Sequence, residues 1–242
     1  MIHMIRTLFS IDKDKDAFQT WVRLRFFGKD EPLRFSHDTG MDILEAKRIA
    51  QCKEYDVCAQ SIEAFVGEIY ERHQLLFPIV KRSYHEEWEK ISRVFYSKIE
   101  TLTEIPWEFS KYRVILSAFH RGISNRNDNI VFRWIFDDPK DHSRITAHEI
   151  LMIHMWKVFE HVFGEQTVAK NEDFFWGANE ITTVAILGLE QDMNILWSKN
   201  QQGFDRFLSD YSQLSDLKER LEKKYRNKTS FREYIEGLQE FF

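Results

Sequence analysis

The residues of this chain best suited to chemistry are one histidine and two glutamates carried by two apolar stretches. His148 and Glu149 lie near the start of the stretch 145–163, and Glu180 lies in the stretch 173–189. Burying an ionisable side chain costs free energy unless a partner compensates it. We therefore expect these groups to meet, either as a direct His–Glu pair or through a metal ion that takes imidazole and carboxylate ligands.

Helical geometry supports this expectation. An α-helix turns about 100° per residue, which centres His148 on the apolar face of its stretch and puts Glu149 at the margin of that face. His154 and His161 fall on roughly the opposite side, where we expect a solvent- or groove-facing pair. Glu180 shares its face with apolar residues, so its carboxylate is also expected to point inward.

The order of helix, two strands, His-Glu helix and Glu helix resembles the gluzincin-type zincin metallopeptidases, whose signature is HExxH. His148 and Glu149 match the first two motif positions, and Glu180, within Asn179-Glu180, matches the downstream NE pattern. The resemblance covers roughly residues 85–190. It implies zinc held by His148 and Glu180, with Glu149 as the catalytic base for a metal-bound water. It also implies a peptide or protein substrate.

The sequence departs from that family at the second ligand position. Met152 stands four residues after His148, and a thioether is a poor ligand for zinc. The next histidine is His154, which gives HExxxxH and faces about 240° away from His148 on a regular helix. The third ligand is therefore left open between His154 and His120. The resulting prediction is a metal-dependent, peptidase-like hydrolase, or an inactive relative that keeps the fold.

Two other functions compete with a metallopeptidase. The first is a non-catalytic binding or scaffold protein in which the His148–Glu180 pair only stabilises the interior. The second is an anion- or nucleotide-binding module that uses Arg121 and Arg126 in the polar loop 120–129. This loop lacks a glycine-rich phosphate motif, so the sequence favours it least.

The periodicity of apolar residues predicts an α+β fold, mostly helical, in which zincin-like helices accompany a small antiparallel or mixed sheet. We expect a single domain over residues 1–242, a zincin-like core over 85–190 and C-terminal helices over 204–242. Residues 132–136 are expected to form the edge strand that lines the substrate cleft. The expected strands are 18–27, 33–36, 112–118 and 130–136, and the expected helices are 41–76, 83–102, 145–163, 173–189, 213–225 and 231–241.

Composition narrows the classes of partner. The 242 residues are 43% hydrophobic and 30% charged, as in ordinary globular proteins. A net charge of -5 argues against a nucleic-acid partner. No apolar run is long enough to cross a bilayer, and no signal peptide is visible, so we expect a cytoplasmic protein without a membrane partner. Cys52 and Cys58 fit no metal or redox spacing and are expected to be reduced structural thiols.

Overall fold

The computed structural model describes residues 5–126, 128–190, 193 and 214–242, and it shows a mostly helical chain with one small mixed sheet. The expected fold class, α+β and mostly helical, is confirmed. Of the expected C-terminal helices, residues 204–213 lie outside the described ranges. The strands are β1 (Arg6–Ser10), β2 (Lys111–Ser117), β3 (Gly122–Ser124) and β4 (Ile130–Trp134). The helices are α1 (Lys13–Phe26), α2 (Glu31–Thr39), α3 (Ile43–Gln51), α4 (Ala59–Arg72), α5 (Leu76–Glu89), α6 (Ser92–Thr103), α7 (Pro139–Phe163), α8 (Glu165–Lys170), α9 (Glu172–Leu189), α12 (Ser215–Arg226) and α13 (Phe231–Glu236), with 3-10 turns η1 (Tyr55–Val57) and η3 (Gly237–Phe241).

The sheet has the strand order β1-β2-β4-β3. Strands β1, β2 and β4 are parallel, and β3 pairs antiparallel with β4, with Ile123 opposite Phe132. The prediction that residues 132–136 form the edge strand is therefore wrong, because β4 lies between β2 and β3. The edge strand β3 falls inside the segment expected to be a loop. Three residues are too few to show the alternation by which strands are recognised in a sequence.

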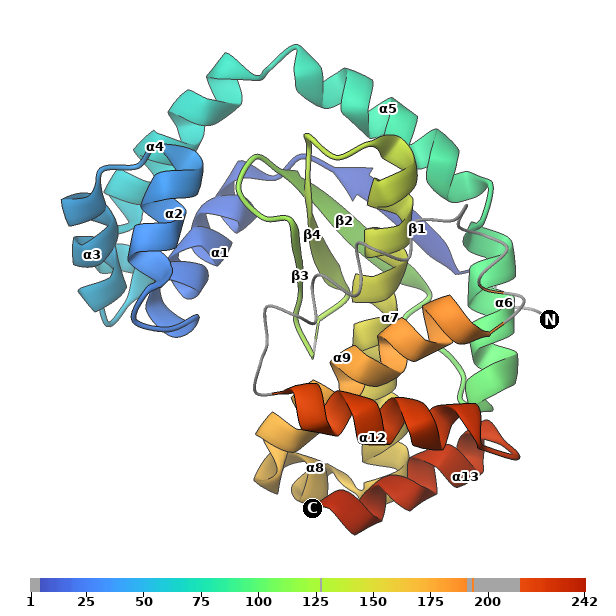
Figure 1. The fold of residues 1–242 in the computed structure, drawn as a ribbon. Coiled ribbons are helices and arrows are strands. Elements are labelled where there is room, and N and C mark those ends of the chain that lie inside the picture. Colours follow the sequence, from blue (N-terminus) through green and yellow to red (C-terminus); the bar gives the residue numbers. More distant parts are fainter. Residues whose placement is uncertain (1–4, 127, 191–192, 194–213) are drawn as a thin grey trace.

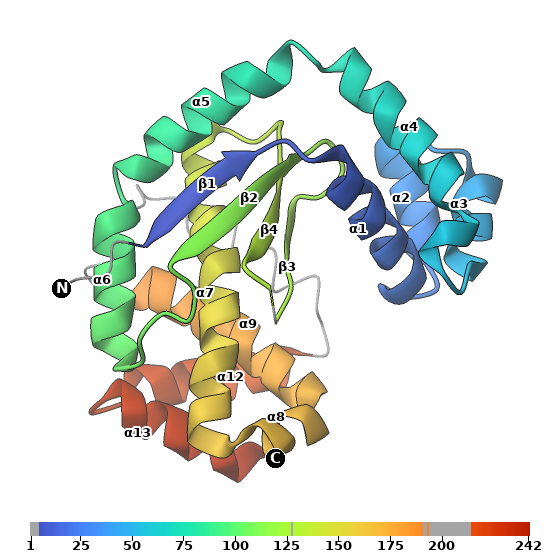
Figure 2. The same ribbon diagram turned by 180° about the vertical axis from the view of Figure 1, so that it is seen from behind.

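Helix α7 is the long helix around which the sheet and the C-terminal helices are arranged. Asp138 caps its start by accepting a hydrogen bond from the backbone N–H of Lys140, and Pro139 occupies the first turn. The helix runs past β4 and β3 and continues down to the layer formed by α8, α9, α12 and α13 (Figures 1 and 2). Helix α9 packs directly against α7, so residues of these two helices can meet.

The N-terminal helices α1 to α4 form a lobe beside the sheet, and α4 and α5 arch from this lobe over the sheet (Figure 1). The predicted strands 18–27 and 33–36 are wrong, because these residues lie in α1 and α2. The alternation that predicted the first strand does not define a face. Leu24 is 1% exposed and Phe26 is 64% exposed, although they are two residues apart. Asp12 fixes the start of α1 by capping the backbone N–H of Lys15.

None of the helices in the described ranges combines the length and apolar character needed to cross a membrane.

Candidate functional site

The side chains of His148 and Glu180 meet between α7 and α9. His148 is 4% exposed and Glu180 is 7% exposed, and the imidazole Nε2 lies 3.1 Å from the carboxylate Oε2. A second contact from α9 holds the two helices in register, since Asn179 Nδ2 donates to the carbonyl oxygen of Met152 at 2.9 Å. The structure therefore brings together the two groups that the apolar faces predicted to converge.

The electrostatics of the pair favour the protonated form of His148. Burial alone would lower the pKa of His148, but the hydrogen bond and charge of Glu180, helped by the charge of Glu149, raise it above its ordinary value. A buried charge is tolerated when an opposite charge and a hydrogen bond accompany it. His148 and Glu180 thus compensate each other's burial directly.

The carboxylate of Glu149 contacts the edge strand β3. Its Oε2 accepts a hydrogen bond from Ser124 Oγ at 2.8 Å, and burial raises its pKa. Gly122 makes the approach possible, since a Cβ at that position would lie only 2.5 Å from Glu149 Oε1. The carboxylate is therefore packed against the backbone of β3.

A buried arginine completes this charged region. Arg133 of β4 is fully buried, and its Nη2 lies 2.5 Å from Asp137 Oδ2. Its positive charge acts to lower the pKa of both His148 and Glu149. The sequence prediction placed this residue in the strand 130–136 without giving it a role. The available signal was that Val131 and Ile135, which share this face, are both apolar.

Neither of the two histidines considered as a third ligand reaches the pair. His154 is 1% exposed and lies under the Trp107 ring, with Nε2 3.0 Å from Thr103 Oγ1, and burial lowers its pKa to about 3. The expectation that His154 faces solvent or a groove is wrong, because α7 is covered on that side as well. His120 is fully buried elsewhere, 3.3 Å from Asp16.

The donor atoms among the described residues therefore do not make up a zinc site. His148 and Glu180 supply two donor atoms that are already hydrogen-bonded to each other, and Met152 stands one turn further along the same face. In the described part of the chain, no three His, Cys, Asp or Glu side chains are placed to hold one metal ion. Zinc sites in proteins need three or four such donors.

The arginines of the 120–129 loop are engaged by protein groups. Arg126 binds Glu160 at 2.7 Å and approaches Glu172 at 3.5 Å. The guanidinium of Arg121 lies 4.7 Å from the centre of the Trp134 ring. Both guanidinium groups therefore already contact protein side chains. The geometry gives no added support to the hypothesis that this loop binds an anion.

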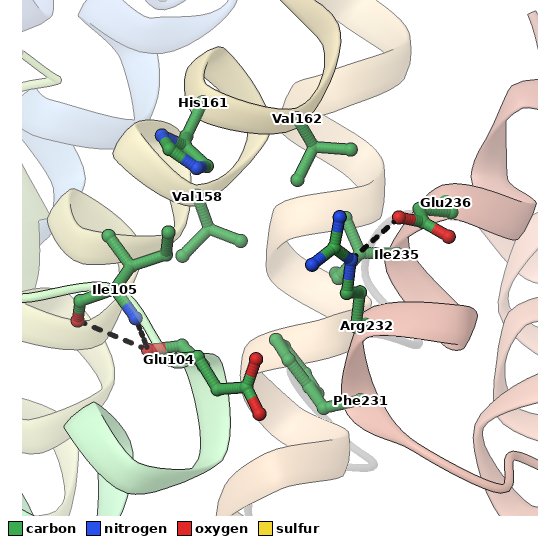
Figure 3. Close-up of a pocket in the computed structure, with 10 residues that line it drawn as sticks. Glu104, Ile105, Val158, His161, Val162, Phe231, Arg232, Ile235 and Glu236 are labelled. Carbon is green, nitrogen blue, oxygen red and sulfur yellow. Dashed lines mark hydrogen bonds and ion pairs between the residues drawn. The ribbon is translucent and has the colours of Figure 1, made fainter.

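A pocket lies away from the charged region, between the end of α6, the C-terminal half of α7 and α13 (Figure 3). Val158 and Ile235 contribute to its apolar wall, and His161 stands on one side. Arg232 at its rim is paired with Glu236 at 2.8 Å. Most of the polar groups here are exposed, and His148, Glu149 and Glu180 are not among the lining residues.

Comparison of the chain with models of known protein families, with curated proteins and with solved structures gives no match.

Proposed function

We propose that this chain is a non-catalytic binding or scaffold protein that keeps a zincin-like arrangement of helices without its metal. The observation that carries the proposal is the direct 3.1 Å contact between His148 and Glu180, with Met152 at the position of the next ligand. Each side chain gives the other a hydrogen bond and an opposite charge, which offsets the cost of burial without a metal ion.

The arrangement of elements supports the resemblance behind this proposal. A short antiparallel edge strand, β3, lies beside the helix that carries His148 and Glu149, and the next long helix carries Glu180. A binding role is supported by exposed aromatic residues on the N-terminal lobe. Phe18 and Phe26, 47% and 64% exposed, both contact the ring of Trp21. Such exposed apolar clusters are typical of surfaces that contact other proteins.

The second candidate is a metal-dependent, peptidase-like hydrolase that would act on a peptide or protein. One observation favours it, namely that His148, Glu149 and Glu180 all gather at the junction of α7, α9 and β3. The incomplete donor set places this candidate behind the first.

Metal analysis of the full chain, purified without added metal or chelator, separates the two candidates. We expect less than about one-tenth of an equivalent of any transition metal, and a melting temperature that a chelator leaves unchanged, because no metal contributes to folding. A stoichiometric metal whose removal lowers the melting temperature would favour the hydrolase.

We also propose a cytoplasmic location. Both cysteines of the chain, Cys52 and Cys58, are free thiols in the structure, which is the usual state of cysteine in a reducing compartment.

A further inference from the structure

The pocket between α6, α7 and α13 combines an apolar side with a charged rim (Figure 3). Its apolar side includes Val158, Phe231 and Ile235, which are each less than one-tenth exposed. The pocket encloses about 210 Å³. A cavity of about 150 Å³ is enough to hold benzene, so this pocket suits a small molecule with a short alkyl or aryl body.

Glu104, on the rim, has a backbone conformation that normally belongs to glycine. Its φ is 57°, and it is the one non-glycine residue with a positive φ in the described part of the chain. It directly follows the last residue of α6, and its N–H donates to the carbonyl oxygen of Glu100. Glycine is usual in such a left-handed helix cap, because a Cβ is strained there. A carboxylate is also disfavoured beside the partial negative charge of a helix C-terminus.

The carboxylate of Glu104 is available to a ligand. No residue in the described ranges donates a hydrogen bond to it or forms an ion pair with it. In Figure 3 it points into the pocket toward Arg232, and the dashed lines beside it join Thr103 to Ile105. The nearby guanidinium of Arg232 is instead paired with Glu236, with Nε 2.8 Å from Oε1.

The charges around the pocket favour a bound cation. The Arg232–Glu236 pair is neutral as a whole, and His161 is positive only when protonated, so Glu104 leaves an unbalanced negative charge. The C-terminal ends of α6 and α7 both border the pocket, and such ends carry partial negative charge. Helix α13 begins here as well, but Ser230 already caps its positive end.

We propose that this pocket is a binding site for a small organic cation, namely a primary ammonium group on a short alkyl or aryl body. The ammonium would donate to the Glu104 carboxylate, and the body would pack against Val158, Phe231 and Ile235. A charge-assisted hydrogen bond of this kind orients the ligand, while burial of its apolar body adds affinity. The site lies apart from the charged region between α7 and α9, so it does not depend on whether that region binds a metal.

The test titrates the full chain with benzylammonium at pH 8, where an exposed imidazole is uncharged, and follows binding by calorimetry and thermal unfolding. We expect a saturable rise in melting temperature, because the ligand binds the folded chain. Benzyl alcohol and benzoate have the same body with a neutral or a negative group, and they should give no comparable rise. No saturable binding of benzylammonium, or equal binding of benzyl alcohol, would overturn the proposal.

Two variants of equal charge locate the site. Glu104→Gln keeps the size of the side chain and removes its charge, and it should weaken the binding of benzylammonium at least about tenfold. Glu100→Gln removes the same charge one turn earlier in α6, outside the pocket lining, and it should bind as the wild type does. Equal losses in the two variants would show a general effect of charge and would contradict a site at Glu104.

Glu104→Gly separates ligand binding from folding. It should also lose the binding of benzylammonium, yet it should raise the melting temperature of the unliganded chain by about 2 to 4 °C, because glycine relieves the strained cap. A glutamate kept only for the fold would behave in the opposite way. A lower melting temperature for Glu104→Gly would therefore overturn the proposal.

Discussion

His148 and Glu180 form a contact whose energetics differ from those of an exposed ion pair. Both side chains are less than one-tenth exposed and lie 3.1 Å apart. Removing one partner of such a pair leaves an uncompensated buried charge, whereas replacing both by apolar residues of similar size is often neutral. We therefore expect His148→Leu and Glu180→Leu each to lower the free energy of unfolding by about 3 to 5 kcal/mol.

The double variant His148→Leu/Glu180→Leu should lie within about 1 kcal/mol of the wild type, since it strands no charge. Urea unfolding of all four proteins gives the coupling free energy. Because the pKa of His148 is raised, the free energy of unfolding of the wild type also carries a dependence on pH that the variants without His148 lack. A group with a raised pKa stabilises the fold fully below its ordinary value of 6.5, and this contribution is lost as the pH rises through the folded-state value. Additive losses from the two single changes would contradict a direct pair.

For a second buried pair, Asp16 and His120, we expect a different dependence of stability on pH. Burial raises the pKa of Asp16 to about 7, against hydrogen bonds from Ser117 and Tyr70, while burial lowers the pKa of His120 to about 3. The contribution of Asp16 to stability falls as the pH rises from 3.8 to about 7. The contribution of His120 rises as the pH rises from about 3 to 6.5, so the two nearly cancel between those limits.

Single variants should reveal these opposed contributions. Relative to the wild type, His120→Gln should lose stability as the pH rises from about 4 to 6.5, and Asp16→Asn should gain it, each by up to about 1.4 kcal/mol per pH unit. Urea midpoints measured across this range check both directions. If the urea midpoints of both variants change with pH in parallel with those of the wild type, neither Asp16 nor His120 titrates as its burial requires.

Among the elements, β3 and α7 depend on a glycine for their close packing. A Cβ at Gly122 would lie 2.5 Å from Glu149 Oε1 and 3.2 Å from Ile145 Cγ2. We expect Gly122→Ala to lower the free energy of unfolding by about 1 to 3 kcal/mol, since Glu149 must move and give up its bond with Ser124.

Gly67 provides the matched control, because a Cβ there meets nothing within 4 Å and the residue lies inside α4. Gly67→Ala should stabilise the chain by about 0.5 to 1 kcal/mol through helix propensity. Urea unfolding measures both effects. An unchanged stability for Gly122→Ala would mean that α7 and β3 are less tightly packed than the structure describes.

Elements with strong periodicity were predictable from the sequence. The helices α7 and α9 and the strands β2 and β4 are confirmed close to their expected positions. The failures have physical causes. Helix α1 buries small and polar residues, such as Ala17 and Thr20, while it exposes Phe26, so its pattern does not show a helical stripe. Strand β3 is too short to give any pattern.

The candidate site was predictable only in part. Helical spacing identified His148 and Glu180 because each interrupts an apolar face, and packing of α9 on α7 brings them together. Spacing could not show that His154 is buried under Trp107, because that contact depends on a segment far away in the sequence. The buried position of Arg133 also depends on tertiary packing, in this case of α7 on the sheet.

At the scale of the whole molecule, a polar contact region joins the N-terminal lobe to the sheet. Tyr70 of α4 donates to Asp16 of α1 and to the carbonyl oxygen of Leu116 in β2, at 2.8 and 3.0 Å. Arg23 adds a bond to the carbonyl oxygen of Phe119 at 2.8 Å. The charged region around His148 lies in the other part of the molecule, so the two buried His–acid pairs stabilise different junctions.

Zinc titration followed by thermal unfolding tests the central claim most directly, because a metal that binds only the folded chain raises its melting temperature. Met152→Ala and Met152→His form a matched pair of variants, since only a histidine at this position would offer a third donor beside His148 and Glu180. We predict that zinc leaves the melting temperatures of the wild type and Met152→Ala unchanged and raises that of Met152→His. Stabilisation of the wild-type chain by one equivalent of zinc, abolished by Glu180→Gln, would contradict a metal-free pair.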